Sequence, residues 1–423
     1  MAYVITQNCC KDASCVPVCP VDCIRPTGGP GEFTDAEMLY IDPVACIDCG
    51  ACLEECPVDA IYYEDDLPPE LERFSDINAA YFEEHPLDAG TQPSVDDHVP
   101  VHAGSLRVAI VGAGPAACYS AGELLRIDAV EVNLFERLPT PFGLIRSGVA
   151  PDHQHTKSVT DIFEHAFTNP RFGCHLNVEV GRDISHDELM AHHHAVIYGF
   201  GASKSRGLGI PGEDLSGNYG AADFVAWYNG HPDHAYDTFN LSAERAIVVG
   251  NGNVALDVAR ILLMERDELA LTDIAEPALT ALAESKIREV VILGRRRPRH
   301  SAFSVGEFLA LGVLPGIDVI IDSDDLNAGP DDDVETSLKL QLAREFAGRA
   351  TAPQNKRIVF RYLISPSEFV GDDHVQGLRV RHNSVDGSGR VVPADLDAET
   401  ELIESPLVLR SIGYKGSAMD GLP

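Results

Sequence analysis

Nine of the eleven cysteines lie within the first 56 residues, at spacings typical of iron–sulfur ligands. The second group reads Cys46-x2-Cys49-x2-Cys52-x3-Cys56-Pro57, the bacterial-ferredoxin motif. Its two-residue gaps let one tight loop direct three thiolates at one cluster. Cys19, which precedes a proline, is the expected fourth ligand. The motif therefore predicts a [4Fe–4S] cluster and single-electron transfer.

The first group of cysteines predicts a second cluster with a different ligand set. The fourth cysteine of such a motif ligates the other cluster, so we expect Cys56 to act there with Cys15 and one earlier cysteine. Cys9 and Cys10 are adjacent and can hardly both face one cluster; we favour Cys9. Three ligands favour a [3Fe–4S] cluster, and a second [4Fe–4S] cluster stays open. The Cys-Pro endings disfavour a zinc ribbon.

Two glycine-rich segments follow, each between an apolar strand pattern and a helical pattern. The first is Gly112-x-Gly114-x-x-Ala117, where glycines allow a tight turn and a close approach of the backbone to a pyrophosphate. Glu136 ends the next strand pattern, where an acid would bind a ribose hydroxyl. These features predict a dinucleotide site.

The second glycine-rich segment is Gly250-Asn251-Gly252-Asn253-Val254. The strand pattern after it ends in Gly294-Arg295-Arg296-Arg297, with arginines where the first site has an acid. Guanidinium groups can form paired hydrogen bonds with a 2′-phosphate, so we expect NADP(H) rather than NAD(H) here.

Composition limits the possible partners and location. The chain has 423 residues and a formal net charge of −34, which disfavours nucleic-acid binding because phosphates would be repelled. We expect no membrane span and no secretory signal. Cysteines at metal-ligand spacing favour a reducing cytoplasm over a disulfide framework.

The predicted fold class is an α+β ferredoxin domain followed by an α/β region with two Rossmann-like dinucleotide-binding domains. We expect a ferredoxin domain at 1–66, a ferredoxin tail and linker at 67–105, the first part of an FAD domain at 106–200 and an NADP domain at 201–403. Residues 404–423 are expected to return to the FAD domain, and 323–355 to form an insertion. Cys23, Cys118 and Cys174 are expected to be unligated, and the run His192–His194 is not expected to bind a metal.

Five segments make the chain resemble adrenodoxin reductase and its bacterial relatives: GAGPAACY, ERLPTPFGLIRSGVAPDH, GNGNVALDVARILL, GRRRPRHSAF and LRSIGYKG. With the seven-iron-type ferredoxin at its start, nearly the whole chain resembles the actinobacterial fused ferredoxin/ferredoxin–NADP reductases. The resemblance implies electron transfer between NADPH, FAD and clusters or an external ferredoxin, or another one-electron acceptor protein.

The resemblance also implies site residues by position. For FAD these are Gly112, Gly114, Ala116, Glu136, Leu144 and Val180. For NADP(H) they are Asn251, Gly252, Asn253 and Val254 at the pyrophosphate, Arg295 and Arg296 at the 2′-phosphate, and Glu307. In the resembled family the chain continues beyond the final Gly-Leu-Pro into a segment that contacts the isoalloxazine ring. We therefore expect an incomplete FAD domain with weak FAD occupancy.

Two alternatives remain from the sequence alone. One is the cluster-bearing, NADPH-oxidising subunit of a larger complex such as glutamate synthase. The other is a truncated, non-catalytic iron–sulfur and NADP-binding electron carrier.

Overall fold

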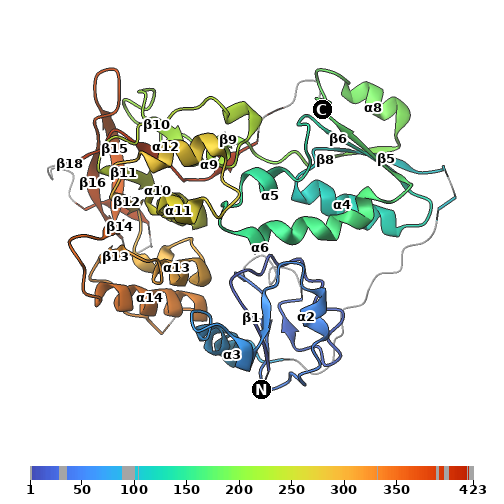
Figure 1. The fold of residues 1–423 in the computed structure, drawn as a ribbon, viewed down its shortest axis with the longest axis horizontal. Helices are drawn as coiled ribbons and strands as arrows, with labels where there is room; N and C mark the ends of the chain where they lie inside the picture. The colour runs from blue at the N-terminus through green and yellow to red at the C-terminus, as the bar shows by residue number, and fades with distance from the viewer. Residues whose placement is uncertain are drawn as a thin grey trace. The chain divides into compact units, whose positions relative to one another are not determined.

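The computed structural model describes residues 2–27, 36–87, 101–102, 104–330, 332–386, 390–394, 400–416 and 418 (Figure 1). The chain divides into two compact units. Unit 1 comprises Met1–Val149, His153–Lys204 and Lys415–Pro423, and unit 2 comprises Ala150–Asp152 and Ser205–Tyr414. Most of the predicted linker at 88–105 and the final Gly-Leu-Pro lie outside the described residues.

The ferredoxin part of unit 1 contains two short antiparallel strand pairs. Strand β1 (Tyr3–Ile5) pairs with β4 (Ile61–Tyr63), and β2 (Ile24–Arg25) pairs with β3 (Tyr40–Ile41). Helix α2 (Ala51–Glu55) and the 3-10 turn η1 (Glu64–Asp66) flank β4, and α3 (Arg73–Glu84) follows.

Helix α3 is joined to both strand pairs by one buried amide. The side-chain oxygen of Asn78 accepts hydrogen bonds from the backbone N–H groups of Ile5 (3.3 Å) and Ile41 (2.9 Å), and its nitrogen donates to the Ile5 carbonyl (2.8 Å). Phe74, also on α3, is fully buried. The ferredoxin core therefore includes residues beyond the predicted boundary at 66.

The second part of unit 1 is a four-stranded parallel sheet in the order β7-β6-β5-β8. The strands are β5 (Arg107–Val111), β6 (Glu131–Glu136), β7 (Phe172–Leu176) and β8 (Ala195–Tyr198). The helical segments are α4 (Pro115–Arg126), α5 (Gly143–Ser147), α6 (Gln154–Lys157), η2 (Ser158–Phe163), α7 (Glu164–Phe167) and α8 (His186–His192). Helix α4 packs on β5 and β6 because its buried face carries small apolar residues (Figure 1).

Unit 2 is built on a six-stranded parallel sheet in the order β10-β19-β11-β12-β14-β13. Its strands are β10 (Asn218–Gly220), β11 (Arg245–Val249), β12 (Glu289–Gly294), β13 (Ile317–Asp322), β14 (Lys356–Tyr362) and β19 (Val408–Arg410). Its helical segments are α9 (Ala221–Tyr228), η3 (Pro232–His234), α10 (Asn253–Leu263), α11 (Arg266–Leu269), α12 (Glu276–Ala283), η4 (Pro298–His300), α13 (Val305–Leu311) and α14 (Val334–Ala347).

A second, antiparallel sheet in unit 2 consists of β15 (Ile364–Val370), β16 (Gly377–Val385), β17 (Val391–Pro393) and β18 (Glu401–Glu404). It shares an apolar core with β11 and β12 that includes Val249, Leu293 and Leu378. The short strands β9 (Lys204–Ser205) and β20 (Tyr414–Lys415) contain the points where the chain passes between the units.

The predicted fold class is confirmed, but two local predictions are wrong. Residues 404–414 do not return to the FAD domain: β19 lies between β10 and β11 in the sheet of unit 2. Residues 323–355 are no insertion, because α14 packs on β13 and connects it to its parallel neighbour β14. The helical pattern expected after the second glycine-rich segment forms two helices, α10 and α11, with Met264 as the C-cap of the first.

The histidine run at 192–194 spans the end of α8 and the two residues that follow it. His192 ends α8, and the backbone N–H of His193 caps that helix through the Leu189 carbonyl. The His194 ring nitrogen Nδ1 accepts a hydrogen bond from the Arg107 backbone (3.0 Å). The His194 ring therefore contributes to the local fold. Within the described residues, no helix combines the length and the apolar character needed to cross a membrane.

Candidate cluster and dinucleotide sites

The second cysteine motif surrounds a cavity in the ferredoxin part. Positive φ angles at Asp48 (56°) and Gly50 (74°) bend the loop that enters α2. A Cβ at Gly50 would lie 3.0 Å from the Tyr3 hydroxyl, so a larger residue would also crowd Tyr3. The cavity is lined by the four predicted ligands, Cys19, Cys46, Cys49 and Cys52, and by Cys23. Four converging thiols fit a [4Fe–4S] cluster.

Cys23 is a fifth thiol at this cavity, although the sequence placed it outside the ligand set. Its Sγ lies 3.4 Å from the Sγ of Cys19, and its backbone N–H donates to the Cys19 sulfur (3.4 Å). The hydrogen bond with Cys23 lowers the pKa of the Cys19 thiol to about 5, which favours the thiolate that iron requires. The four-residue gap from Cys19 is the signal that could have identified this neighbour.

The thiols of the first cysteine group lie near enough to influence one another electrostatically. The charges of Cys9 and Cys56 both act on Cys15, whose pKa is raised first by burial and then by these neighbours. Backbone N–H groups point at two of the sulfurs: Leu39 donates to Cys9 (3.5 Å) and Ala60 donates to Cys56 (3.3 Å). Such N–H···S contacts stabilise thiolate ligands and tune cluster potentials.

Cys10 differs from Cys9 in its contacts. Its thiol lies 3.7 Å from the Asp12 carboxylate, and burial together with that carboxylate raises the pKa of Cys10 to about 12. Burial also raises the pKa of the Cys9 thiol, and backbone N–H groups lower the pKa of both thiols. The contact that distinguishes Cys10 is its side-chain contact with Asp12.

The first glycine-rich loop joins β5 to α4. Gly112 has φ +100°, and a Cβ there would lie 2.8 Å from the Gly199 carbonyl oxygen. Gly114 caps α4 in an extended conformation, which leaves the helix N-terminus open to an anion. Ala117 is fully buried and Ala116 is exposed beside it. The loop thus has the shape of a pyrophosphate cradle.

Glu136, the last residue of β6, contacts this loop through its side chain. Its side chain is 8% exposed, and its two oxygens accept hydrogen bonds from the backbone N–H groups of Ala113 and Leu138, each 2.8 Å long. The other predicted FAD residues are spread more widely. Val180 is buried in the core that contains Val111, whereas Leu144 on α5 is 64% exposed.

The second glycine-rich loop repeats this geometry between β11 and α10. Gly250 has φ +113°, and an added Cβ would overlap the Ser411 carbonyl oxygen. Gly252 caps α10, and Asn253 is the first helical residue, followed by Val254. The Asn253 side-chain oxygen accepts a hydrogen bond from the Ser304 backbone (2.7 Å), which ties the loop to the start of α13. Asn251 bonds to Ser301 in the same segment (3.2 Å).

The arginines after β12 fall into two pairs. Arg297 and Arg299 bind acids of the same unit, with Arg297 donating to Asp325 (2.8 Å) and Arg299 to Asp332 (2.9 Å). The side chains of Arg295 and Arg296 are exposed, and neither forms a hydrogen bond or ion pair within the described part of the chain. The two arginines predicted to bind phosphate are therefore the two that remain available.

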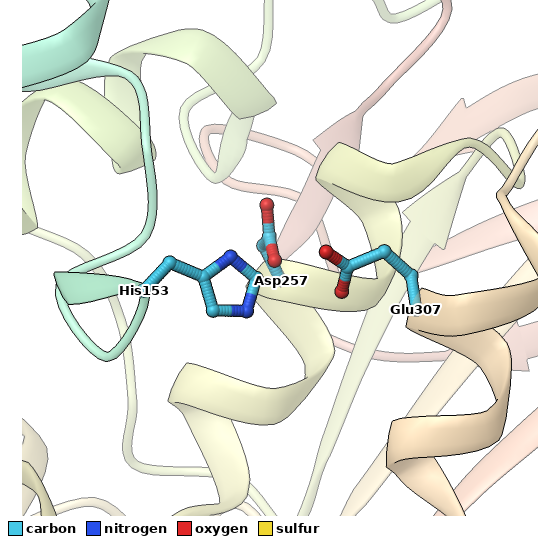
Figure 2. Close-up of side chains that lie close together, drawn as sticks. All are labelled: His153, Asp257 and Glu307. Carbon is cyan, nitrogen blue, oxygen red and sulfur yellow. The ribbon is translucent and has the colours of Figure 1, made fainter. Parts of the chain in front are cut away.

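Glu307 lies in a buried ionic cluster that the sequence did not reveal. Its carboxylate is 3.5 Å from Arg260, which also pairs with Asp152 (2.6 Å) and Asp257 (2.7 Å). Figure 2 shows Asp257 on α10 and Glu307 on α13, with carboxylates that point into the same space. Burial opposes the charge of Arg260, but Asp257 and Asp152 outweigh it and raise the pKa of the guanidinium. The i,i+3 spacing of Asp257 and Arg260 is the only local signal.

Comparison with family models gives two matches. Residues 39–62 match a model described as a 4Fe-4S binding domain, which includes Cys46, Cys49, Cys52 and Cys56. Residues 110–172 match an NAD(P)-binding Rossmann-like domain, which includes Gly112 and Glu136.

Comparison with individual proteins extends over the whole chain. A probable ferredoxin/ferredoxin–NADP reductase of Mycobacterium leprae is 45% identical over 435 residues, covering 100% of this chain and 76% of the relative. The NADPH-ferredoxin reductase FprA of Mycobacterium tuberculosis is 46% identical over 75% of this chain and 72% of its own length. The solved structure of M. tuberculosis FprA in complex with NADPH matches with a TM-score of 0.72 at 44% identity, covering 75% of this chain and 73% of that one.

Proposed function

The chain belongs to the family of fused ferredoxin/ferredoxin–NADP reductases, which transfer electrons from NADPH, and we propose how its residues divide that task. Unit 2 binds NADP(H) through Gly252, Asn253 and Val254, with Asn251 supporting the loop. Arg295 and Arg296 bind the 2′-phosphate. The observation that carries this proposal is the availability of these two guanidinium groups at the end of β12, while Arg297 and Arg299 are paired with acids.

For unit 1 we propose FAD as the bound dinucleotide. Gly112, Gly114 and Ala116 form the pyrophosphate loop, Glu136 holds a ribose, and Leu144 and Val180 line the remainder of the site. When bound, a flavin accepts a hydride from NADPH and passes electrons singly to iron–sulfur clusters. The likeness to FprA over both glycine-rich loops supports this assignment. A flavin absorption spectrum of the purified chain tests it, and a protein that shows iron–sulfur absorption without flavin would favour the non-catalytic carrier.

For the ferredoxin part we propose two clusters. Cys19, Cys46, Cys49 and Cys52 hold a [4Fe–4S] cluster, and Cys9, Cys15 and Cys56 hold a [3Fe–4S] cluster. The contact of Cys10 with Asp12 supports Cys9 as the third ligand. Anaerobic iron analysis with EPR tests this: about eight irons per chain without a [3Fe–4S] signal would contradict it.

The electron partner is proposed to be an external ferredoxin or another one-electron acceptor protein. Cluster ligation requires reduced thiols, which supports the cytoplasm as the location.

The NADP(H) assignment is tested by removing the two positive charges that follow β12. The double variant Arg295→Ser/Arg296→Ser should weaken NADPH binding much more than NADH binding, because each charge-assisted contact contributes about 1.5–3 kcal/mol. Arg297→Ser is the matched control, since Arg297 is committed to Asp325. An equal loss for both coenzymes would assign the arginine pair a structural role.

A further inference from the structure

We propose that Asn383, a buried residue on β16, is a positioning residue for NADP(H) selectivity: it fixes the backbone from which Arg295 and Arg296 project. This inference rests on the proposed role of the two arginines. Asn383 lies 88 residues from Arg295 in the sequence, on a strand of the antiparallel sheet rather than the nucleotide-binding sheet.

The amide of Asn383 reaches the arginine segment directly. Its Nδ2 donates to the Arg295 carbonyl oxygen (3.0 Å) and to the Ser365 hydroxyl (2.7 Å). The residue is only 6% exposed, so its polar groups are withdrawn from water. A buried amide that lost these partners would retain its desolvation cost, which makes the contact to Arg295 more than incidental.

Leu363 provides the second attachment and shows that the arrangement is constrained. It occupies the corner between β14 and β15 with φ +55°, a left-handed conformation that is unfavourable for leucine. Its backbone N–H donates to the Arg296 carbonyl (3.1 Å), and its own carbonyl accepts from the Asn383 backbone (2.7 Å). Leu363 and Asn383 therefore hold two consecutive carbonyls.

These hydrogen bonds hold the backbone beyond the last residue that the parallel sheet pairs. Strand β12 ends at Gly294, so Arg295 and Arg296 lie beyond the parallel ladder with β14. A planar guanidinium binds phosphate well only when two of its N–H groups are aligned with two phosphate oxygens. Fixing both Cα positions lowers the entropy lost when the exposed side chains close on a phosphate. Asn383 thus contributes to selectivity without touching the coenzyme.

The experiment compares NADP⁺ with NAD⁺, which differ only in the 2′-phosphate, in equilibrium binding by calorimetry. Asn383→Ala should lower the ratio of NADP⁺ to NAD⁺ affinity about three- to tenfold, the equivalent of one lost hydrogen bond. Ser365→Ala is the matched control: it removes the other partner of the same amide and should change the ratio less than twofold. Asn383→Leu, which keeps the branched shape of the side chain, repeats the test without leaving a cavity.

Two further measurements make the outcome decisive. In an Arg295→Ala/Arg296→Ala background, Asn383→Ala should change the ratio no further, because Asn383 acts only through those side chains. An unchanged ratio in folded Asn383 variants overturns the inference, as does loss of folding in both. If the arginine double variant itself leaves the ratio unchanged, the proposed phosphate site fails first.

Discussion

The two glycine-rich loops share one backbone geometry and differ in what lies beside them. Gly112 and Gly250 both have positive φ, and Gly114 and Gly252 both cap a helix in an extended conformation. The difference lies at the end of the neighbouring strand. Glu136 ends β6 and accepts from the first loop, whereas Arg295 follows β12. In the proposed sites, the two loops would both accept a pyrophosphate, and the residue at the neighbouring strand end would select the ribose substituent.

The helices behind the loops differ just as clearly. Helix α4 buries only small or apolar side chains, including Ala117 and Ala121. Helix α10 buries Arg260 among three carboxylates. The corresponding position in α4, seven residues after the first helical residue, is Gly122, where an added Cβ would meet nothing within 4 Å. Helix α10 thus carries a buried ionic cluster behind the second glycine-rich loop, whereas the described residues of α4 bury no charged side chain.

The largest expected effect comes from removing that ionic cluster. Arg260→Met should lower the free energy of unfolding of unit 2 by about 3–5 kcal/mol, because it leaves buried carboxylates uncompensated. Trp227, the sole tryptophan, is 5% exposed on α9, which packs on α10, so its fluorescence during urea titration reports on unit 2. Gly122→Ala, at the matching position of unit 1, should be stabilising by about 0.5–1 kcal/mol. If both substitutions changed the free energy of unfolding equally, the buried ionic cluster would not distinguish α10 from α4.

The next effect distinguishes the two glycines of the second loop. Gly250→Ala combines a left-handed backbone with overlap at Ser411, so we expect about 2–4 kcal/mol of destabilisation by the same fluorescence titration. Gly252→Ala is the control: its Cβ would lie 3.9 Å from the nearest atom, at Ala302. That variant should keep its stability and lose NADPH affinity. If Gly252→Ala unfolds as readily as Gly250→Ala, the two glycines do not have separate roles.

A third prediction concerns the acid of the first site. Glu136→Gln should weaken FAD binding about 5- to 30-fold, or roughly 1–2 kcal/mol, because a neutral amide can accept from only one of the Ala113 and Leu138 N–H groups and loses charge-assisted bonds to a ribose. Flavin content after dialysis measures the loss. NADPH binding and the Trp227 midpoint should stay as in the parent chain. Retention of all flavin would show that the acid serves the loop backbone alone.

Local features of the molecule could be predicted from sequence because local geometry determines them. The cluster ligands and the two glycine-rich loops can be recognised from the types and spacing of residues that are close in the sequence. The position of β19 could not be predicted, because Val408 pairs with a residue about 160 positions earlier, in β11. The apolar pattern of a strand does not indicate which strands it pairs with. Buried polar partners were missed for the same reason: Arg260 looks like one charge on an apolar helix, and Asn383 looks like an ordinary strand residue.

The smallest expected effect on stability comes from placing the first helical residue of α4 at the matching position of α10. Helix α4 begins with Pro115 and α10 with Asn253. Asn253→Pro is compatible with the backbone, because a proline suits the first helical position and Gly252 before it is extended (φ −100°, ψ 179°). The change removes the acceptor for the Ser304 N–H and should cost about 0.5–1 kcal/mol, part of which the stiffer unfolded chain offsets. Asn253→Ala, without that offset, should cost slightly more. Both variants are compared by Trp227 fluorescence; if Asn253→Ala leaves the midpoint unchanged, the bond to Ser304 does not tie the loop to α13.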